Sequence, residues 1–222
     1  MTPVSTIDPV DFVGRVKPLL ESQDLHGLHQ LLRTQWTADQ IVSILAIGDA
    51  DARKVASLAL SLVGCRKCVE KVVGQLKDAD PMTNEMAEHA LWAIWFRCGN
   101  QEANAHISEG SRLLGLRDFE RAIEHFSAAI KADPTFAEAY NQRAIVKYLT
   151  EQFEESIVDC RKATELMPCH FGAWAGMGHC FAHLGKPERA IRCYRRALAI
   201  NPHLGCLVEA IHVLEAGIES LE

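Results

Sequence analysis

The sequence has no long hydrophobic run, and this excludes several classes of protein. No stretch approaches the roughly 20 apolar residues of a transmembrane helix, and Asp8 and Asp11 stand where a secretory signal would carry basic residues. Aromatic residues make up only 7% of the 222 residues. A basic excess is also missing, because 23 Lys and Arg face 29 Asp and Glu, for a net charge of −6. We therefore expect a soluble, cytoplasmic protein that binds neither membranes nor nucleic acid.

Catalytic motifs are missing as well. The sequence has no Gly-rich phosphate loop and no G-x-S-x-G motif. His179 and His183 have the i, i+4 spacing of a zinc-protease helix, but the Glu that would follow the first His is absent. Glu154, Glu155 and Asp159 are interpreted as a solvated helix face. The sequence predicts no enzyme, no catalytic residue, no metal site and no cofactor.

The eight cysteines leave a second interpretation open. A chain of this length can build a core without disulfides, and Cys98, Cys160, Cys180 and Cys193 lie in apolar helical patterns, which favours free, buried thiols. Cys65-Arg66-Lys67-Cys68 could instead be a redox pair or half of a zinc site. Either this motif or the Cys and His residues of 169–183 would serve an alternative function: a metal- or redox-responsive helical regulator.

From residue 103 onward the sequence repeats itself every 34 residues. The third copy is the clearest and carries Trp174, Met177, Gly178, Phe181, Ala190, Tyr194, Ala197 and Pro202. Three sets of equivalent positions keep their character in all copies: Gly110, Ala144 and Gly178; Ile123, Ile157 and Ile191; Pro134, Pro168 and Pro202. The small residues permit close helix approach, and each Pro ends a helix. Each copy is therefore predicted to be one structural unit.

The pattern resembles the tetratricopeptide repeat over residues 103–136, 137–170 and 171–204. The second copy departs most, with Lys147 in place of an aromatic residue and Ser156 and Cys160 in place of Ala and an aromatic residue. The resemblance implies an all-α, right-handed superhelical solenoid of helix pairs. Its three units are expected at 103–116 with 119–132, 137–150 with 153–166, and 171–184 with 187–200. An amphipathic stretch at about 205–220 is expected to cap the last unit.

Residues 1–100 show a different helical rhythm and form a separate predicted domain from 101–222. Helices are expected near 9–21, 24–34, 38–47, 50–63, 66–77 and 83–97. Two Asp-rich turns, at 49–51 and 78–80, each precede an Ala/Leu-rich helix. This arrangement resembles a pair of HEAT-type units, and an irregular α-helical bundle is the alternative.

The repeat resemblance implies a non-enzymatic interaction scaffold or adaptor that binds a peptide or protein segment in a concave groove. The lining of the groove is predicted to include Ser111, Glu138, Asn141, Ile145, Tyr148, His179 and His183. One subset of the family clamps a C-terminal carboxylate with Lys, Asn and Arg. At the equivalent positions this chain carries none of the clamp residues. It has Ile107, Ser111, Gln142, Gly172 and Gly176 there.

One basic patch stands out in this acidic chain. It consists of Arg189, Arg192, Arg195 and Arg196, on the second helix of the third copy. We interpret it as a solvated face, with contact to an acidic partner as the alternative. The oligomeric state is not predicted.

Overall fold

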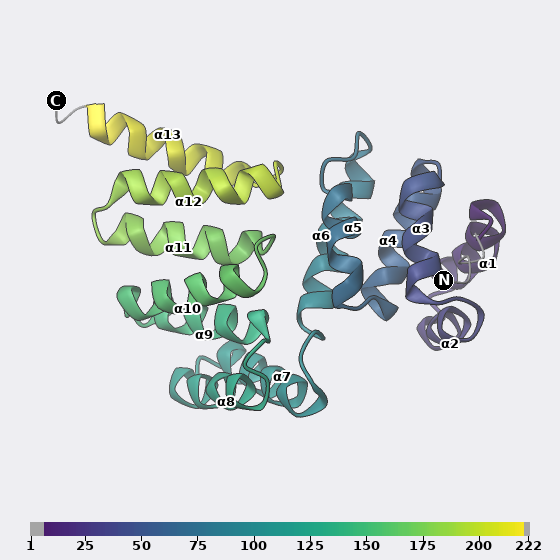
Figure 1. Ribbon diagram of the computed structural model, residues 1–222, viewed down its shortest axis with the longest axis horizontal. Helices are drawn as coiled ribbons and strands as arrows, with labels where there is room; N and C mark the ends of the chain where they lie inside the picture. Colours follow the sequence, from purple (N-terminus) through teal and green to yellow (C-terminus); the bar gives the residue numbers. More distant parts are fainter. Residues whose placement is uncertain (1–6, 220–222) are drawn as a thin grey trace. The chain divides into compact units, whose positions relative to one another are not determined.

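The computed structural model describes residues 7–219, which form thirteen α-helices, one short 3-10 helix and no strand (Figure 1). The chain divides into two compact units, Met1–Trp95 and Phe96–Glu222. The all-α prediction is confirmed for the part of the chain that the structure describes.

The N-terminal unit contains six α-helices. They are α1 (Pro9–Glu21), α2 (Leu25–Gln35), α3 (Ala38–Ile47), α4 (Ala50–Val63), α5 (Val69–Gln75) and α6 (Pro81–Trp95), with the 3-10 helix η1 (Arg66–Cys68) before α5. Capping side chains explain where several of them begin, since Asp8, Asp24, Thr37 and Asp49 each accept a hydrogen bond from a backbone N–H of the first turn. The predicted helix 66–77 differs, because its first turn is 3-10.

The two Asp-rich turns of this unit are joined by one arginine. Arg53 donates from Nε and Nη2 to the carboxylate of Asp78 at 2.7 and 3.1 Å, and from Nη1 to the carbonyl of Gly48 at 2.9 Å. These bonds lower the pKa of Asp78 and raise that of Arg53. The link holds the start of α4 against the turn before α6, and α4 and α6 pack along each other. A HEAT-type origin of this unit remains a prediction.

The C-terminal unit is a stack of helix pairs. The pairs are α7 (Gln101–Gly115) with α8 (Phe119–Ala132), α9 (Ala137–Leu149) with α10 (Phe153–Leu166), and α11 (Phe171–His183) with α12 (Pro187–Ile200). Figure 1 shows the two helices of each pair running antiparallel, and α13 (Gly205–Glu219) lies along α12 and covers the last pair. The helices begin and end within about two residues of the predicted bounds.

Glycine–aromatic contacts set the close approach inside the first and third pairs. A Cβ at Gly110 would lie 2.6 Å from the ring of Phe126, and a Cβ at Gly178 would overlap the ring of Tyr194. Both rings are buried. The glycines are therefore required so that each ring can pack closely against the neighbouring helix.

The second pair uses a polar connection instead. Arg143 donates to both carboxylate oxygens of Asp159 at 2.8 and 2.7 Å, and Lys147 donates to the same carboxylate at 2.7 Å. The Asp159 side chain is only 3% exposed. The interpretation of Asp159 as part of a solvated face is therefore wrong, although Glu154 and Glu155 are exposed. Lys147 stands where the repeat usually carries an aromatic residue, and here its charge pairs with the buried Asp159 carboxylate.

The turn inside each pair has the same unusual backbone. Arg117, Glu151 and Gly185 lie 34 positions apart and have φ angles of 61°, 59° and 65°. Only the third is a glycine, the residue that adopts this left-handed conformation without strain. The period of the sequence is thus visible in the backbone as well as in the side chains.

Candidate functional site

A cavity of about 210 Å³ lies between α9 and α11, the first helices of the second and third pairs, and α10 forms its third wall. It is lined by Asn141, Ala144, Ile145 and Tyr148 of α9, Ser156 and Cys160 of α10, and Gly172, Ala175, Gly176 and His179 of α11. The lining has no Asp, Glu, Lys or Arg. The cavity is therefore suited to an apolar or uncharged group.

Missing side-chain volume creates this cavity. Phe126 and Tyr194 fill the equivalent space in the first and third pairs, but in the second pair the position is Cys160. On the facing helix, Gly172 and Gly176 contribute no side chain, and a Cβ at Gly176 would only reach 3.4 Å from Cys160 Sγ. Ser156 adds only a small side chain to the lining, and its Oγ donates to the carbonyl of Ala144 at 2.8 Å.

Aromatic and imidazole rings gather at one end of the cavity. Tyr148 Oη lies 2.9 Å from His183 Nε2, and the His183 ring stacks on Phe153 at 4.8 Å between centroids. His179 Nδ1 lies 2.8 Å from Tyr194 Oη. Burial, together with nearby His183, lowers the pKa of His179, and burial raises the pKa of Tyr148. Both groups are consequently uncharged near neutral pH.

These contacts bear on the metal hypothesis for 169–183. His179 and His183 bond different tyrosines, and His170 is buried against Glu138, so the three imidazoles do not share a common ligand position. Among residues 7–219 there is no group of three or more His, Cys, Asp or Glu side chains that could hold a metal ion.

Four of the predicted groove residues meet at the cavity: Asn141, Ile145, Tyr148 and His179. His183 adjoins them through Tyr148, whereas Ser111 lies on α7, outside the cavity lining. The predicted groove lining did not include Cys160, Gly172 and Gly176, which the structure places in the cavity wall. A signal for them was present, since Cys160 stands where a repeat of this kind carries an aromatic residue.

Glu138 lies inside the protein and not on the surface of the groove. It was predicted to line the groove, but it is 1% exposed and belongs to a buried hydrogen-bond network. Its Oε2 lies 2.6 Å from His170 Nε2, and its Oε1 accepts from Gln142 at 2.6 Å and from Asn141 at 3.3 Å. The carboxylate is satisfied inside the protein and is not available to a partner.

The C-x-x-C motif lies at η1 in the N-terminal unit. The Sγ atoms of Cys65 and Cys68 are 3.9 Å apart, and burial raises the pKa of Cys68 to about 11. Cys68 is therefore a thiol at neutral pH, the opposite of the activated thiolate of a redox motif. In the C-terminal unit Cys160, Cys180 and Cys193 are buried as predicted, and burial raises the pKa of each. Cys98, which is predicted to be buried as well, is only half-buried.

Comparison with known families covers the helix pairs. Residues 107–168 and 172–204 match models that are both described as Tetratricopeptide repeat. The protein is a tetratricopeptide repeat protein. Both matches lie in the C-terminal unit, so the tetratricopeptide assignment rests on α7–α12. Within residues 7–219, every helix is too short or too polar to span a lipid bilayer.

Its curated relatives include other tetratricopeptide repeat proteins. It is 27% identical over 160 residues to anaphase-promoting complex subunit 3 of Schizosaccharomyces pombe, which covers 65% of this chain and 24% of that protein. It is 29% identical over 93 residues to small glutamine-rich tetratricopeptide repeat-containing protein 2 of Saccharomyces cerevisiae. This match covers 42% of this chain and 27% of that protein. The chain thus spans about a quarter of these two relatives.

Solved tetratricopeptide domains share the fold of about half of this chain. The first such domain of Spaghetti (RPAP3), bound to the HSP90 peptide SRMEEVD, has a TM-score of 0.53 at 21% identity and covers 54% of this chain and 94% of that one. The second domain of human RPAP3, in complex with the HSP70 peptide SGPTIEEVD, has a TM-score of 0.50 at 25% identity and covers 51% and 95%.

Proposed function

We propose that this tetratricopeptide repeat protein is a non-enzymatic adaptor that binds a segment of a partner protein along α9 and α11. The segment inserts an apolar side chain into the cavity between these helices. The observation that carries the proposal is the cavity itself, which opens where the second repeat lacks an aromatic residue and α11 presents Gly172 and Gly176. A pocket for one anchoring side chain, surrounded by polar groups, is typical of peptide-binding surfaces.

The uncharged lining defines the class of partner. The related domains of RPAP3 hold acidic peptides of HSP90 and HSP70. Here Ile107, Ser111, Gln142, Gly172 and Gly176 occupy the positions at which the carboxylate-clamping subset carries basic or amide side chains that reach the peptide. Ile107 and Gln142 are buried. The proposal therefore favours an internal segment with an apolar anchor over a free C-terminal carboxylate.

A selection experiment tests the proposal. A random dodecapeptide phage library is panned on the immobilised full chain, and enriched peptides are measured against Gly176→Leu, whose side chain would occupy the cavity. Gly115→Leu is the matched control, because a Cβ at this exposed helical glycine meets nothing within 4 Å. We expect enriched peptides with an apolar residue at one fixed position, and at least about a tenfold loss of affinity in Gly176→Leu only.

Equal affinity of the enriched peptides for Gly176→Leu and the wild-type chain would remove the cavity from the proposal. Synthetic SRMEEVD serves as a separate probe. We expect it to bind no more tightly than its C-terminally amidated form, since a clamp would discriminate between the two.

The alternative function, a metal- or redox-responsive regulator, remains a prediction, as does the cytoplasmic location. Metal analysis of the purified full chain and titration of its eight thiols address the first. Stoichiometric zinc, or loss of two thiols on mild oxidation with a change in partner binding, would favour the regulator over the adaptor.

A further inference from the structure

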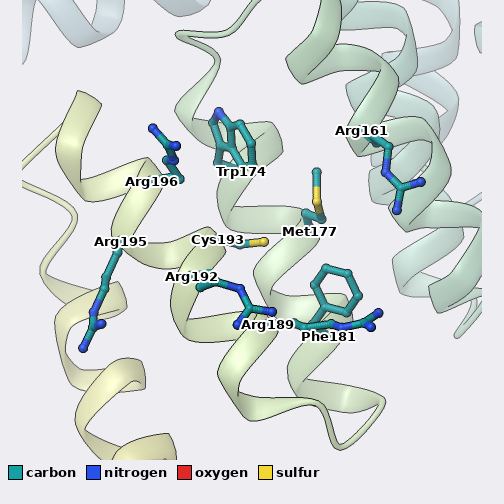
Figure 2. A pocket seen from close by; sticks show the side chains of 9 residues that line it. All are labelled: Arg161, Trp174, Met177, Phe181, Arg189, Arg192, Cys193, Arg195 and Arg196. Carbon is teal, nitrogen blue, oxygen red and sulfur yellow. The ribbon is translucent and has the colours of Figure 1, made fainter.

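A second and larger hollow of about 480 Å³ lies on a different side of the repeat domain. Figure 2 shows its lining: Arg161 from α10, Trp174, Met177 and Phe181 from α11, and Arg189, Arg192, Cys193, Arg195 and Arg196 from α12. Its volume falls within the range of about 300–1,000 Å³ that is usual for ligand pockets.

The floor of this arginine pocket is apolar. Met177, Phe181 and Cys193 are buried beneath it, and Trp174 is half-buried, with its indole N–H donating to the carbonyl of Pro168 at 3.0 Å. Successive residues turn by about 100° around a helix. Trp174, Met177 and Phe181 therefore lie on the side of α11 opposite to Gly172, Gly176 and His179, so the arginine pocket is separate from the cavity described above.

Four of the five arginines that line the arginine pocket have no acidic partner among residues 7–219. Arg189, Arg192 and Arg196 follow each other along one face of α12, and Arg161 faces them from α10 (Figure 2). None of these four forms a salt bridge with an Asp or Glu of residues 7–219, whereas Arg195 does, to Glu215 at 2.7 Å. Five of the chain's 23 Lys and Arg residues thus line one hollow in a protein of net charge −6.

We propose that the arginine pocket binds an acidic segment of a partner protein that also carries an apolar anchor residue. The anchor packs on Trp174, Met177 and Phe181, while carboxylates on either side pair with the guanidinium groups of Arg161, Arg192 and Arg196. Guanidinium is suited to this role because its planar N–H donors match a carboxylate in a two-bond geometry. Charge complementarity and an apolar centre together specify the partner.

The same observations disfavour a polyanion without apolar groups. A nucleic acid or an anionic membrane surface would use an extended basic track or face, but here the arginines surround a single hollow whose floor is apolar. A protein segment satisfies both parts of the pocket, since one side chain can fill the floor while its neighbours reach the rim.

Three labelled peptides test this with the full chain in fluorescence anisotropy. EEDLEEFLEDEE carries both acidic and apolar groups, QQNLQQFLQNQQ removes the charge, and EEDSEESSEDEE removes the anchors. We expect the first to bind at least about tenfold more tightly than either of the others. Raising the salt from about 50 to about 300 mM is expected to weaken it several-fold, because exposed charges are screened.

Charge reversal locates the site. Arg192→Glu combined with Arg196→Glu is expected to lower the binding affinity of the first peptide by about tenfold or more. Arg33→Glu combined with Lys131→Glu is the matched control, with the same change in net charge at exposed positions elsewhere. It should bind as the wild-type chain does. Gly176→Leu should also bind this peptide normally, which separates this proposal from the one above.

Three results would overturn the proposal: equal binding of the three peptides, equal losses in the two charge-reversed variants, or tighter binding of oligo-dT or of phosphatidylserine vesicles than of the acidic peptide. Far-ultraviolet circular dichroism confirms that the variants are folded before their affinities are compared.

Discussion

His170 lies 2.6 Å from Glu138, from Nε2 to Oε2, and both side chains are fully buried. The other ring nitrogen of His170, Nδ1, accepts the backbone N–H of Ala173 at 3.1 Å. Nδ1 therefore carries no proton, and Nε2 is the donor to Glu138. One imidazole both caps the N-terminus of α11 and fixes it to α9.

Replacement of this histidine is predicted to be strongly destabilising. His170→Ala removes the cap and leaves the buried Glu138 carboxylate without one of its two closest donors, while Gln142 keeps the other contact at 2.6 Å. We expect a loss of about 3 kcal/mol in the free energy of unfolding, measured by urea denaturation. His212→Ala, at an exposed position of α13, is the control and should change the midpoint little. An unchanged midpoint in His170→Ala would contradict the assigned role.

The glycine–tyrosine contact of the third pair predicts a contrast within one helix. A Cβ at Gly178 would overlap Tyr194, so Gly178→Ala should cost about 1–3 kcal/mol of stability. Gly176→Ala in the same helix meets only Cys160 Sγ at 3.4 Å, and higher helix propensity should make it neutral or stabilising. Thermal unfolding of the two variants checks this, and similar melting temperatures would refute the packing argument.

The left-handed turns offer a stabilising substitution. Arg117 and Glu151 have φ angles of 61° and 59°, so replacing either with Gly should relieve backbone strain. We expect Arg117→Gly to gain about 0.5–1 kcal/mol in the free energy of unfolding, and Gly185→Ala to lose a similar amount. A loss of stability in Arg117→Gly, measured in urea, would show that its side chain contributes more than the strain costs.

The lowered pKa of His179 predicts how stability depends on pH. Its pKa in the folded protein lies below the ordinary value of 6.5. The unfolded chain therefore binds the proton more readily, and stability falls as the pH drops below about 6.5. His179→Gln should flatten this dependence between about pH 7.5 and 5, as followed by urea denaturation at several pH values. His203→Gln, at an exposed position, is the control, and an equal flattening there would refute the assignment.

Local sequence signals predicted the helices of the repeats well. The 34-residue period and its prolines place every helix from α7 to α12 within about two residues of its observed bounds. These features are local, because caps, breakers and small residues act within one or two turns. In the N-terminal unit the same signals located α1–α4, but not the 3-10 turn that shortens the helix predicted at 66–77.

Long-range polar pairs were not predictable in this way. Glu138 has the spacing of a groove residue, but its partner His170 lies 32 positions away. Asp159 has the pattern of a surface residue, and its burial depends on Arg143 and Lys147 of the preceding helix. The cavity at Cys160 is a volume that no side chain fills, and a sequence pattern reports such a volume only as a missing aromatic residue.

The opposite faces of α11 have a consequence for avidity. One helix, about 10–12 Å across with its side chains, forms a wall of both the uncharged cavity and the arginine pocket. A partner chain with two short motifs could reach from one to the other around the edge of the domain. Its second contact would then depend on an effective concentration set by the spacer between the motifs, rather than on the concentration of partner in solution.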